Sequence, residues 1–244
     1  MKDARLHPRH TQMKHCALLL SLLCLLLTPA HAQQKAKARK TPPKLTTAVV
    51  KNEERLYKTT PQGELKLHLS FPADWKPEDK RPGAVFFFGG GWTSGSFKQF
   101  TSLCDYLASR GIVAASADYR IKSIHQTKPD ACVEDAKSAV RWMRAHAAEL
   151  GIDPGKLIAG GGSAGGHLAA CTATIEGFNA AGDPQGISAV PNALVLFNPA
   201  VNIGTLARQR NASAEDIAAA EAITPKARFR SWLGSVQQHQ TKIK

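Results

Sequence analysis

The sequence predicts an α/β fold in which a mainly parallel central sheet carries helices on both faces. Short apolar runs, typical of buried strands, occupy residues 84–88, 112–117, 156–160 and 192–198. Segments with apolar residues at helical spacing lie between them, chiefly 133–150 and 163–176. Strands that alternate with helices of this length indicate parallel pairing, because each helical crossover returns the chain to the same end of the sheet.

Two other segments complete the predicted elements. Residues 64–69 alternate polar and apolar, which predicts a half-exposed antiparallel strand near the start of the sheet, with His68 facing solvent. In the helix over 133–150, the apolar positions share one face, so Asp135 and Lys137 are expected to cover other faces. A helical segment is also expected near residues 212–222.

Residues 161–165 read Gly-Gly-Ser-Ala-Gly and match G-x-S-x-G, the nucleophile elbow. The pattern lies between the predicted strand 156–160 and the predicted helix that begins at Ser163. In a sharp strand-to-helix turn, side chains at 161 and 165 would collide with neighbouring backbone, and glycine avoids the collision. Because a glycine-rich pentapeptide can also be an ordinary loop, this strand–turn–helix setting decides the interpretation, which makes Ser163 the candidate nucleophile.

A second glycine motif follows the buried strand 84–88. The strand runs directly into Gly89-Gly90-Gly91-Trp92, where three glycines leave backbone N–H groups uncovered. Acyl transfer develops negative charge on the former carbonyl oxygen, and fixed N–H donors stabilise that charge. The motif therefore predicts an oxyanion site, and the alternative is a flexible loop.

The order and spacing of these motifs resemble the α/β-hydrolases, and among them the hormone-sensitive-lipase-like esterases and bacterial acetyl-esterase or acetylxylan-esterase relatives. The resemblance runs from about Arg55 to about Pro225 and also includes residues 117–120 and 150–154. Two departures occur: Phe88 stands where many relatives have His, and Gly162 where many have Asp.

The resemblance implies ester hydrolysis through an acyl-serine intermediate on Ser163, with no cofactor or metal. Gly89, Gly90 and the Ala164 N–H would form the oxyanion hole, and Trp92 and Tyr119 would border the substrate pocket. Relatives use the residues around Asp118 structurally, so Asp118 is assigned to fold support. The expected substrates are small esters with short acyl groups such as acetate, including acylated plant polysaccharide for an exported enzyme.

The catalytic acid and base have few candidates in this chain. The family order is Ser, then Asp or Glu, then His, yet the only histidines after Ser163 are His167 and His239. His167 lies one helical turn beyond the serine and resembles a packing position in relatives. Residues 226–244 are polar and lack strand periodicity, so we interpret them as an aberrant or disordered tail after a frameshift or early stop. The last strand–helix units, with the triad Asp and His, would then be missing.

A second class of function stays open for that reason. A chain without its acid and base could be a catalytically dead remnant or a carbohydrate-binding pseudoenzyme that keeps the sheet. Loss of a triad member leaves only modest residual catalysis, so weak activity alone does not decide between the two.

The first 32 residues have the pattern of a secretory signal peptide. A basic start leads into the apolar run 17–27, and Ala30-His31-Ala32 forms a small-residue cleavage site, which predicts cleavage after Ala32 and a secreted or periplasmic protein. The apolar run is shorter than the roughly 20 residues that span a bilayer, so no stable membrane insertion is expected after cleavage. A basic flexible segment over 33–53 and an incomplete hydrolase domain over 54–225 are expected to follow.

The net charge of the chain bears on its class of binding partner. The formal net charge is +13, but the basic residues are dispersed and the basic segment has no interleaved aromatics, which argues against nucleic acid. Attraction to acidic polysaccharide or a membrane surface is an alternative use of that charge.

The cysteines suggest one disulfide. An exported protein permits such a bond, with Cys104–Cys132 the candidate pair, while Cys171 is expected in the core.

Overall fold

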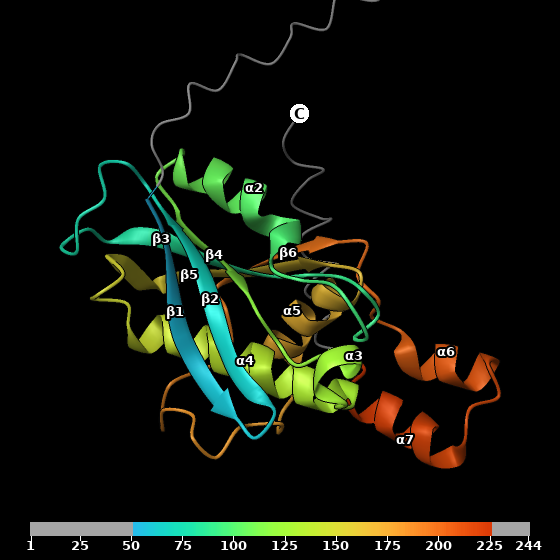
Figure 1. The fold of residues 1–244 in the computed structure, drawn as a ribbon. Helices are drawn as coiled ribbons and strands as arrows, with labels where there is room; N and C mark the ends of the chain where they lie inside the picture. Colours follow the sequence, from blue (N-terminus) through green and yellow to red (C-terminus); the bar gives the residue numbers. More distant parts are fainter. Residues whose placement is uncertain (1–50, 226–244) are drawn as a thin grey trace, which may run out of the picture. The chain divides into compact units, whose positions relative to one another are not determined.

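The computed structural model describes residues 51–225, which form one six-stranded sheet with helices packed against it (Figure 1). The strands are β1 (Lys51–Thr60), β2 (Gly63–Phe71), β3 (Arg81–Phe87), β4 (Val113–Ala117), β5 (Ile152–Gly162) and β6 (Ala193–Phe197). The helices are α2 (Lys98–Ala108), α3 (Lys122–His125), α4 (Pro129–Ala145), α5 (Ala164–Thr174), α6 (Ile203–Gln209) and α7 (Ala214–Ala222).

The sheet has the order β1-β2-β4-β3-β5-β6. β1 and β2 form an antiparallel hairpin, β2 is antiparallel to β4, and the pairs β4–β3, β3–β5 and β5–β6 are parallel. The predicted α/β class, with its mainly parallel sheet and an antiparallel start, is confirmed. The predicted flexible basic segment does not extend to residue 53, because residues 51–53 belong to β1 and pair in register with β2.

The sequence Gly-Ile-Asp-Pro-Gly at 151–155 enters β5, which begins at Ile152. Arg81 of β3 pairs with Ile152, but Gly83 pairs with Leu157, so β5 carries extra residues between two paired stretches. The segment Asp153–Lys156 is the irregular part, and Asp153 Oδ1 accepts the Gly155 N–H at 2.8 Å. The residues between the two paired stretches thus form an irregular bulge inside the strand.

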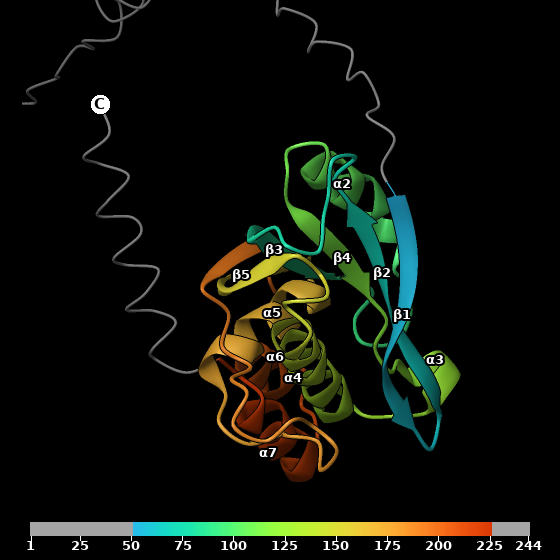
Figure 2. The same ribbon diagram turned by 90° about the vertical axis from the view of Figure 1, so that its left-hand side faces the viewer.

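The two faces of the sheet are covered by different helices (Figure 2). α2 packs on β4 and β2, and its Phe100 stacks on Phe86 of β3 at 5.4 Å, whereas α4 and α5 pack together on the opposite face. Cys104 of α2 and Cys132 of α4 are therefore separated by the sheet, and both are buried free thiols. The proposed Cys104–Cys132 disulfide is wrong for this reason, whereas Cys171 is buried in the core as expected.

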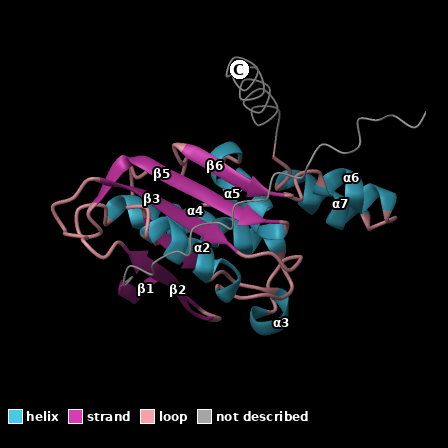
Figure 3. Ribbon diagram, turned by 90° about the horizontal axis from the view of Figure 1, so that it is seen from above, coloured by secondary structure: helices cyan, strands magenta, loops and turns pink. Residues whose placement is uncertain are grey.

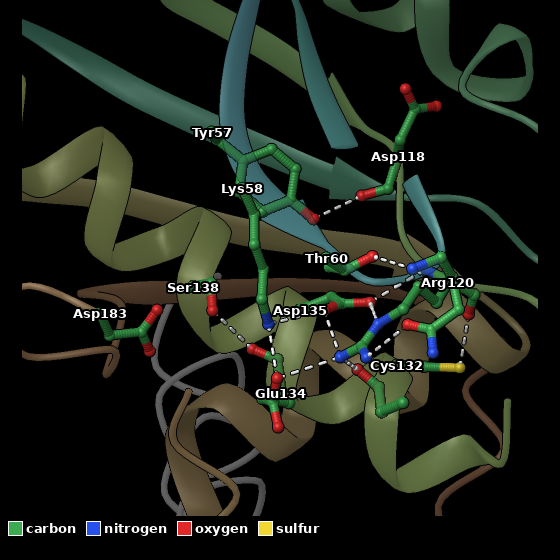
Figure 4. Close-up of polar contacts among 12 residues, drawn as sticks. Tyr57, Lys58, Thr60, Asp118, Arg120, Cys132, Glu134, Asp135, Ser138 and Asp183 are labelled. Atoms are coloured by element: carbon green, nitrogen blue, oxygen red, sulfur yellow. Dashed lines mark hydrogen bonds and ion pairs between the residues drawn. The ribbon is translucent and has the colours of Figure 1, made fainter. Parts of the chain in front are cut away.

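A buried ion cluster joins the β1–β2 hairpin to α4 (Figure 4). Asp135 is fully buried and accepts from Lys58 Nζ at 2.7 Å and from Arg120 through Nε at 2.8 Å, a terminal guanidinium nitrogen at 2.8 Å and the backbone N–H at 3.0 Å. Glu134 also pairs with both cations. Asp135 is expected on a face of α4 other than the apolar one, and that face is itself buried because β1 and Arg120 lie over it.

The polar side of α4 holds the long connection between α5 and β6. Lys137, also expected on a face other than the apolar one, is buried and donates to the carbonyls of Ile175 and Gly177. Burial lowers the pKa of Lys137. Arg141 pairs with Asp183 at 2.6 Å. These cations satisfy backbone and side-chain acceptors in a segment that has no regular structure of its own.

α6 and α7 pack against each other beyond the carboxyl ends of β5 and β6 (Figure 3). β6 pairs only with β5 within residues 51–225, and its Val195 and Phe197 are exposed. None of the helices in this described range is long and apolar enough to cross a membrane. The predicted signal peptide, most of the basic segment, and the tail 226–244 lie outside the described residues.

Candidate active site

Ser163 stands between the end of β5 and the start of α5. Its backbone has φ 51° and ψ −115°, a conformation that a residue with a side chain rarely adopts. The turn is held by hydrogen bonds from the Ser163 N–H to the Phe197 carbonyl at 3.0 Å and from the His167 N–H to the Ser163 carbonyl at 3.0 Å. The side chain is exposed, as a nucleophile requires.

The glycines around Ser163 are required by close approach of the backbone of β3. A Cβ on Gly165 would lie 1.9 Å from the Phe87 carbonyl oxygen, and one on Gly161 would lie 2.5 Å from the same oxygen. The predicted steric need for glycine at both positions is confirmed. The main obstacle at Gly165 is the neighbouring strand, whereas at Gly161 the Gly165 backbone is equally close, with its carbonyl carbon at 2.5 Å.

The glycine loop after β3 folds beside Ser163. The Gly90 carbonyl accepts from the Thr93 and Ser94 N–H groups, each at 3.1 Å, which closes a turn. Gly90 has φ 133°, and a Cβ there would lie 2.0 Å from the Ser94 carbonyl oxygen. Gly89, Gly90 and Ser163 line one cavity of about 870 Å³.

The three predicted oxyanion donors are not equivalent. The Gly89 N–H donates to Gln99 Oε1 at 2.6 Å, so it is already occupied. Gly90 and Ala164 have no recorded acceptor for their N–H groups among residues 51–225. The assignment of Gly89 as a donor is therefore corrected, and Gly90 and Ala164 are the donors left available beside Ser163.

Trp92 and Tyr119, the expected substrate contacts, have different surroundings. Trp92 has φ 59° and lines a separate cavity of about 710 Å³ between the glycine loop and α6–α7. Tyr119 is 1% exposed, stacks on Phe88 with ring centroids 4.1 Å apart, and donates its hydroxyl to the Phe88 carbonyl at 2.7 Å. Tyr119 thus supports the residue before the glycine loop, and its assignment to a substrate pocket is wrong because the ring is enclosed in the core.

His167 is fully buried behind the elbow. Its Nε2 lies 2.7 Å from the Ile223 carbonyl oxygen and 3.2 Å from Cys171 Sγ, and its ring meets the Trp92 ring edge-on at 5.2 Å. Burial lowers its pKa to about 4, which keeps the imidazole neutral near pH 7. The ring makes no hydrogen bond to Ser163 among the described contacts, in agreement with a packing role.

Asp118 has the structural role expected of it. Its carbonyl accepts the Tyr57 hydroxyl at 2.7 Å, and its Oδ2 lies 3.1 Å from His68 Nε2. The His68 ring stacks on Phe97 at 3.4 Å, and its Nδ1 lies 3.2 Å from Glu54. The prediction that His68 faces solvent is wrong, because the α2 N-terminus covers it.

No base contacts the nucleophile within residues 51–225. The other histidines of this range have local partners: His125 Nδ1 accepts from the Ile121 N–H, and His146 stacks on Trp142. His239 lies outside the described residues. In the same range, no group of three His, Cys, Asp or Glu side chains is arranged to hold a metal ion. The described part of the chain thus brings the candidate nucleophile, Ser163, and the candidate oxyanion donors of Gly90 and Ala164 together.

The sheet order, the strained serine elbow and the adjoining glycine loop together define an α/β-hydrolase of the hormone-sensitive-lipase-like esterase class. Within that class the chain belongs to the BD-FAE family, whose model matches residues 69–242.

Relatives of known activity agree with this assignment. Carboxylesterase NlhH of Mycobacterium tuberculosis is 30% identical over 165 residues, which cover 65% of this chain and 50% of the relative. Thermogutta terrifontis esterase 2, phosphonylated by cyclosarin, matches with a TM-score of 0.65 and 48% identity over 71% of this chain and 64% of that one. Its propionate-bound form matches with a TM-score of 0.66 and 46% identity over 75% and 68%. The chain thus spans about half the length of the curated relative.

Proposed function

We propose that this protein is a serine carboxylic-ester hydrolase that acts on esters of short acyl groups. The observation that carries the proposal is the exposed Ser163 in its strained elbow, in one cavity with Gly90. Strain of this kind costs on the order of 1–3 kcal/mol and persists where the surrounding structure enforces it, which favours a functional serine over an ordinary loop.

The reaction follows from the arrangement of these groups. Ser163 Oγ attacks the ester carbonyl carbon, and the carbonyl electron pair moves onto the oxygen, where the Gly90 and Ala164 N–H groups stabilise the charge. Collapse of the tetrahedral intermediate breaks the ester C–O bond, releases the alcohol and leaves an acyl-serine. Water then attacks this acyl group and releases the carboxylic acid. The resemblance assigns the proton transfers to a histidine. Within residues 51–225, no histidine ring makes a hydrogen bond to Ser163.

The proposed acyl preference draws on relatives. Thermogutta terrifontis esterase 2 has been solved with propionate and with butyrate bound, and both are short carboxylic acids. We extend this preference to acetyl esters. We include acylated polysaccharide among the substrates because the predicted signal peptide would place the enzyme outside the cytoplasm. N-terminal sequencing of the exported protein tests that part, and a mature start other than Gln33 would contradict the predicted cleavage site.

Hydrolysis of 4-nitrophenyl esters by residues 33–244 tests the catalytic proposal. We expect turnover of the acetate, propionate and butyrate esters, a sharp fall for octanoate, and loss of turnover in Ser163→Ala. Ser123→Ala is the matched control, because Ser123 is exposed in α3 and lies outside the Ser163 cavity.

Equal background rates for wild type and Ser163→Ala would instead favour the second candidate, a carbohydrate-binding pseudoenzyme. The observation that favours the pseudoenzyme is that no histidine ring within residues 51–225 makes a hydrogen bond to Ser163. Binding of acetylated xylan oligosaccharides, measured by calorimetry with the same two proteins, then distinguishes a binding protein from an inactive remnant.

A further inference from the structure

Gln99, in the first turn of α2, contacts the glycine loop beside the nucleophile. Its Oε1 accepts the Gly89 N–H at 2.6 Å, and its side chain lines the same cavity as Ser163. Gln99 is ten residues from Gly89 in the chain and belongs to a helix that the sequence analysis did not predict. The contact is therefore visible only in the folded chain.

The held peptide lies directly against the elbow. A Cβ on Gly89 would lie 3.4 Å from Ser163 Cβ and 3.0 Å from the Gly162 carbonyl oxygen. Three successive glycines have wide backbone freedom, so without external contacts their N–H groups would point in many directions. The Gly90 carbonyl is fixed on one side by the turn through Ser94, and Gln99 fixes the peptide on the other side.

The Gln99 residue is exposed, but the backbone on both sides of it is anchored. On one side of it, the Phe97 carbonyl accepts the Ser116 hydroxyl of β4 at 2.8 Å. On the other side, Phe100 is buried and stacks on Phe86 of β3. Both neighbours are thus anchored to the sheet that carries the glycine loop, which limits movement of Gln99 relative to Gly89.

We propose that Gln99 is a positioning residue of the oxyanion site. By occupying the Gly89 N–H, it sets the orientation of the loop so that the next N–H group, that of Gly90, is presented to the Ser163 cavity. The effect of Gln99 on catalysis rests on the proposed ester hydrolysis, but the hydrogen bond between Gln99 and Gly89 can be tested without any reaction.

The first measurement is amide hydrogen exchange at Gly89, followed by NMR on the 15N-labelled protein. Gln99→Met has a similar length but no acceptor, and we expect Gly89 exchange about tenfold faster than in wild type. Gln99→Glu keeps an acceptor oxygen at the same reach, so it should restore wild-type protection. Lys98→Met is the matched control, because Lys98 is exposed, adjacent in α2 and outside the cavity.

The second measurement is the rate of Ser163 labelling by a fluorophosphonate. In this reaction Ser163 Oγ forms a bond to phosphorus, the phosphorus–fluorine bond breaks, fluoride leaves and the hydroxyl proton passes to solvent. The phosphoryl oxygen gains charge during the reaction and uses the same N–H donors as an ester oxyanion. We expect Gln99→Met to label about tenfold more slowly, and Lys98→Met to label at the wild-type rate.

The outcomes separate this inference from the proposed function. Unchanged Gly89 exchange in Gln99→Met would overturn the inference, and so would faster exchange with an unchanged labelling rate. If Gln99→Glu fails to restore the protection of the Gly89 N–H, then the acceptor oxygen of Gln99 does not hold the loop, and the inference is overturned. A wild-type protein that does not label would refute the proposed esterase, and the exchange data would then decide by themselves whether Gln99 holds the loop.

Discussion

Replacement of Asp135 by Ala removes the central anion of the buried cluster between β1 and α4. The change leaves Lys58 and Arg120, whose side chains are only 12% and 11% exposed, without their shared carboxylate. Breaking a buried ion pair by removing one partner costs about 3–5 kcal/mol of unfolding free energy, because the partner charge stays buried. Glu134 still pairs with both cations, so the lower end, about 3 kcal/mol, is expected.

Urea unfolding followed by tryptophan fluorescence measures this effect. With a slope of about 2 kcal/mol per molar urea, a loss of about 3 kcal/mol lowers the midpoint by about 1.5 M. Glu149→Ala removes the same charge at an exposed position just after α4, and it should change the free energy by less than about 0.5 kcal/mol.

A midpoint for Asp135→Ala within about 0.3 M of wild type, at an unchanged slope, would refute this reasoning. That result would mean that Lys58 and Arg120 regain water or other partners at little cost. The hairpin would then not depend on the cluster for its attachment to α4.

Three further predictions concern the elbow and its supports. Gly165→Ala places a Cβ 1.9 Å from the Phe87 carbonyl oxygen, so it should lower stability by about 3 kcal/mol or prevent folding; an unchanged thermal midpoint would contradict this. Tyr119→Phe leaves the Phe88 carbonyl without its 2.7 Å donor and should cost about 1–2 kcal/mol in urea unfolding; a cost under about 0.5 kcal/mol would refute that support.

His167, whose pKa burial lowers to about 4, binds a proton more weakly in the folded than in the unfolded state, so stability is lost as pH falls below about 6.5. Between pH 7 and pH 5 the loss should be about 2 kcal/mol larger in wild type than in His167→Gln, and equal pH dependence would argue against a neutral buried imidazole.

Much of the fold and the candidate nucleophile could be predicted from local sequence. The buried strands, the helix after Ser163 and the G-x-S-x-G pattern depend on residues close together in the chain, although the obstacle that requires glycine at 165 is the Phe87 carbonyl of the neighbouring strand. Periodicity and steric limits act over such short distances, so they predicted the α/β class and the elbow. The two glycine motifs also lie at the ends of neighbouring strands, β3 and β5, as parallel pairing requires.

Other features depended on contacts between distant segments. Gln99 reaches Gly89 only because α2 packs across the sheet, and this contact removes Gly89 from the oxyanion donors. The sheet also separates Cys104 from Cys132. Asp135 of α4 is buried because it forms an ion pair with Arg120.

The sequence by itself determined the α/β class, the candidate nucleophile and the glycine loop, because these follow from the local spacing of apolar and glycine residues. The tertiary structure alone decided which polar groups are buried, paired or left available, because hydrogen bonds and ion pairs form between groups that only folding brings together.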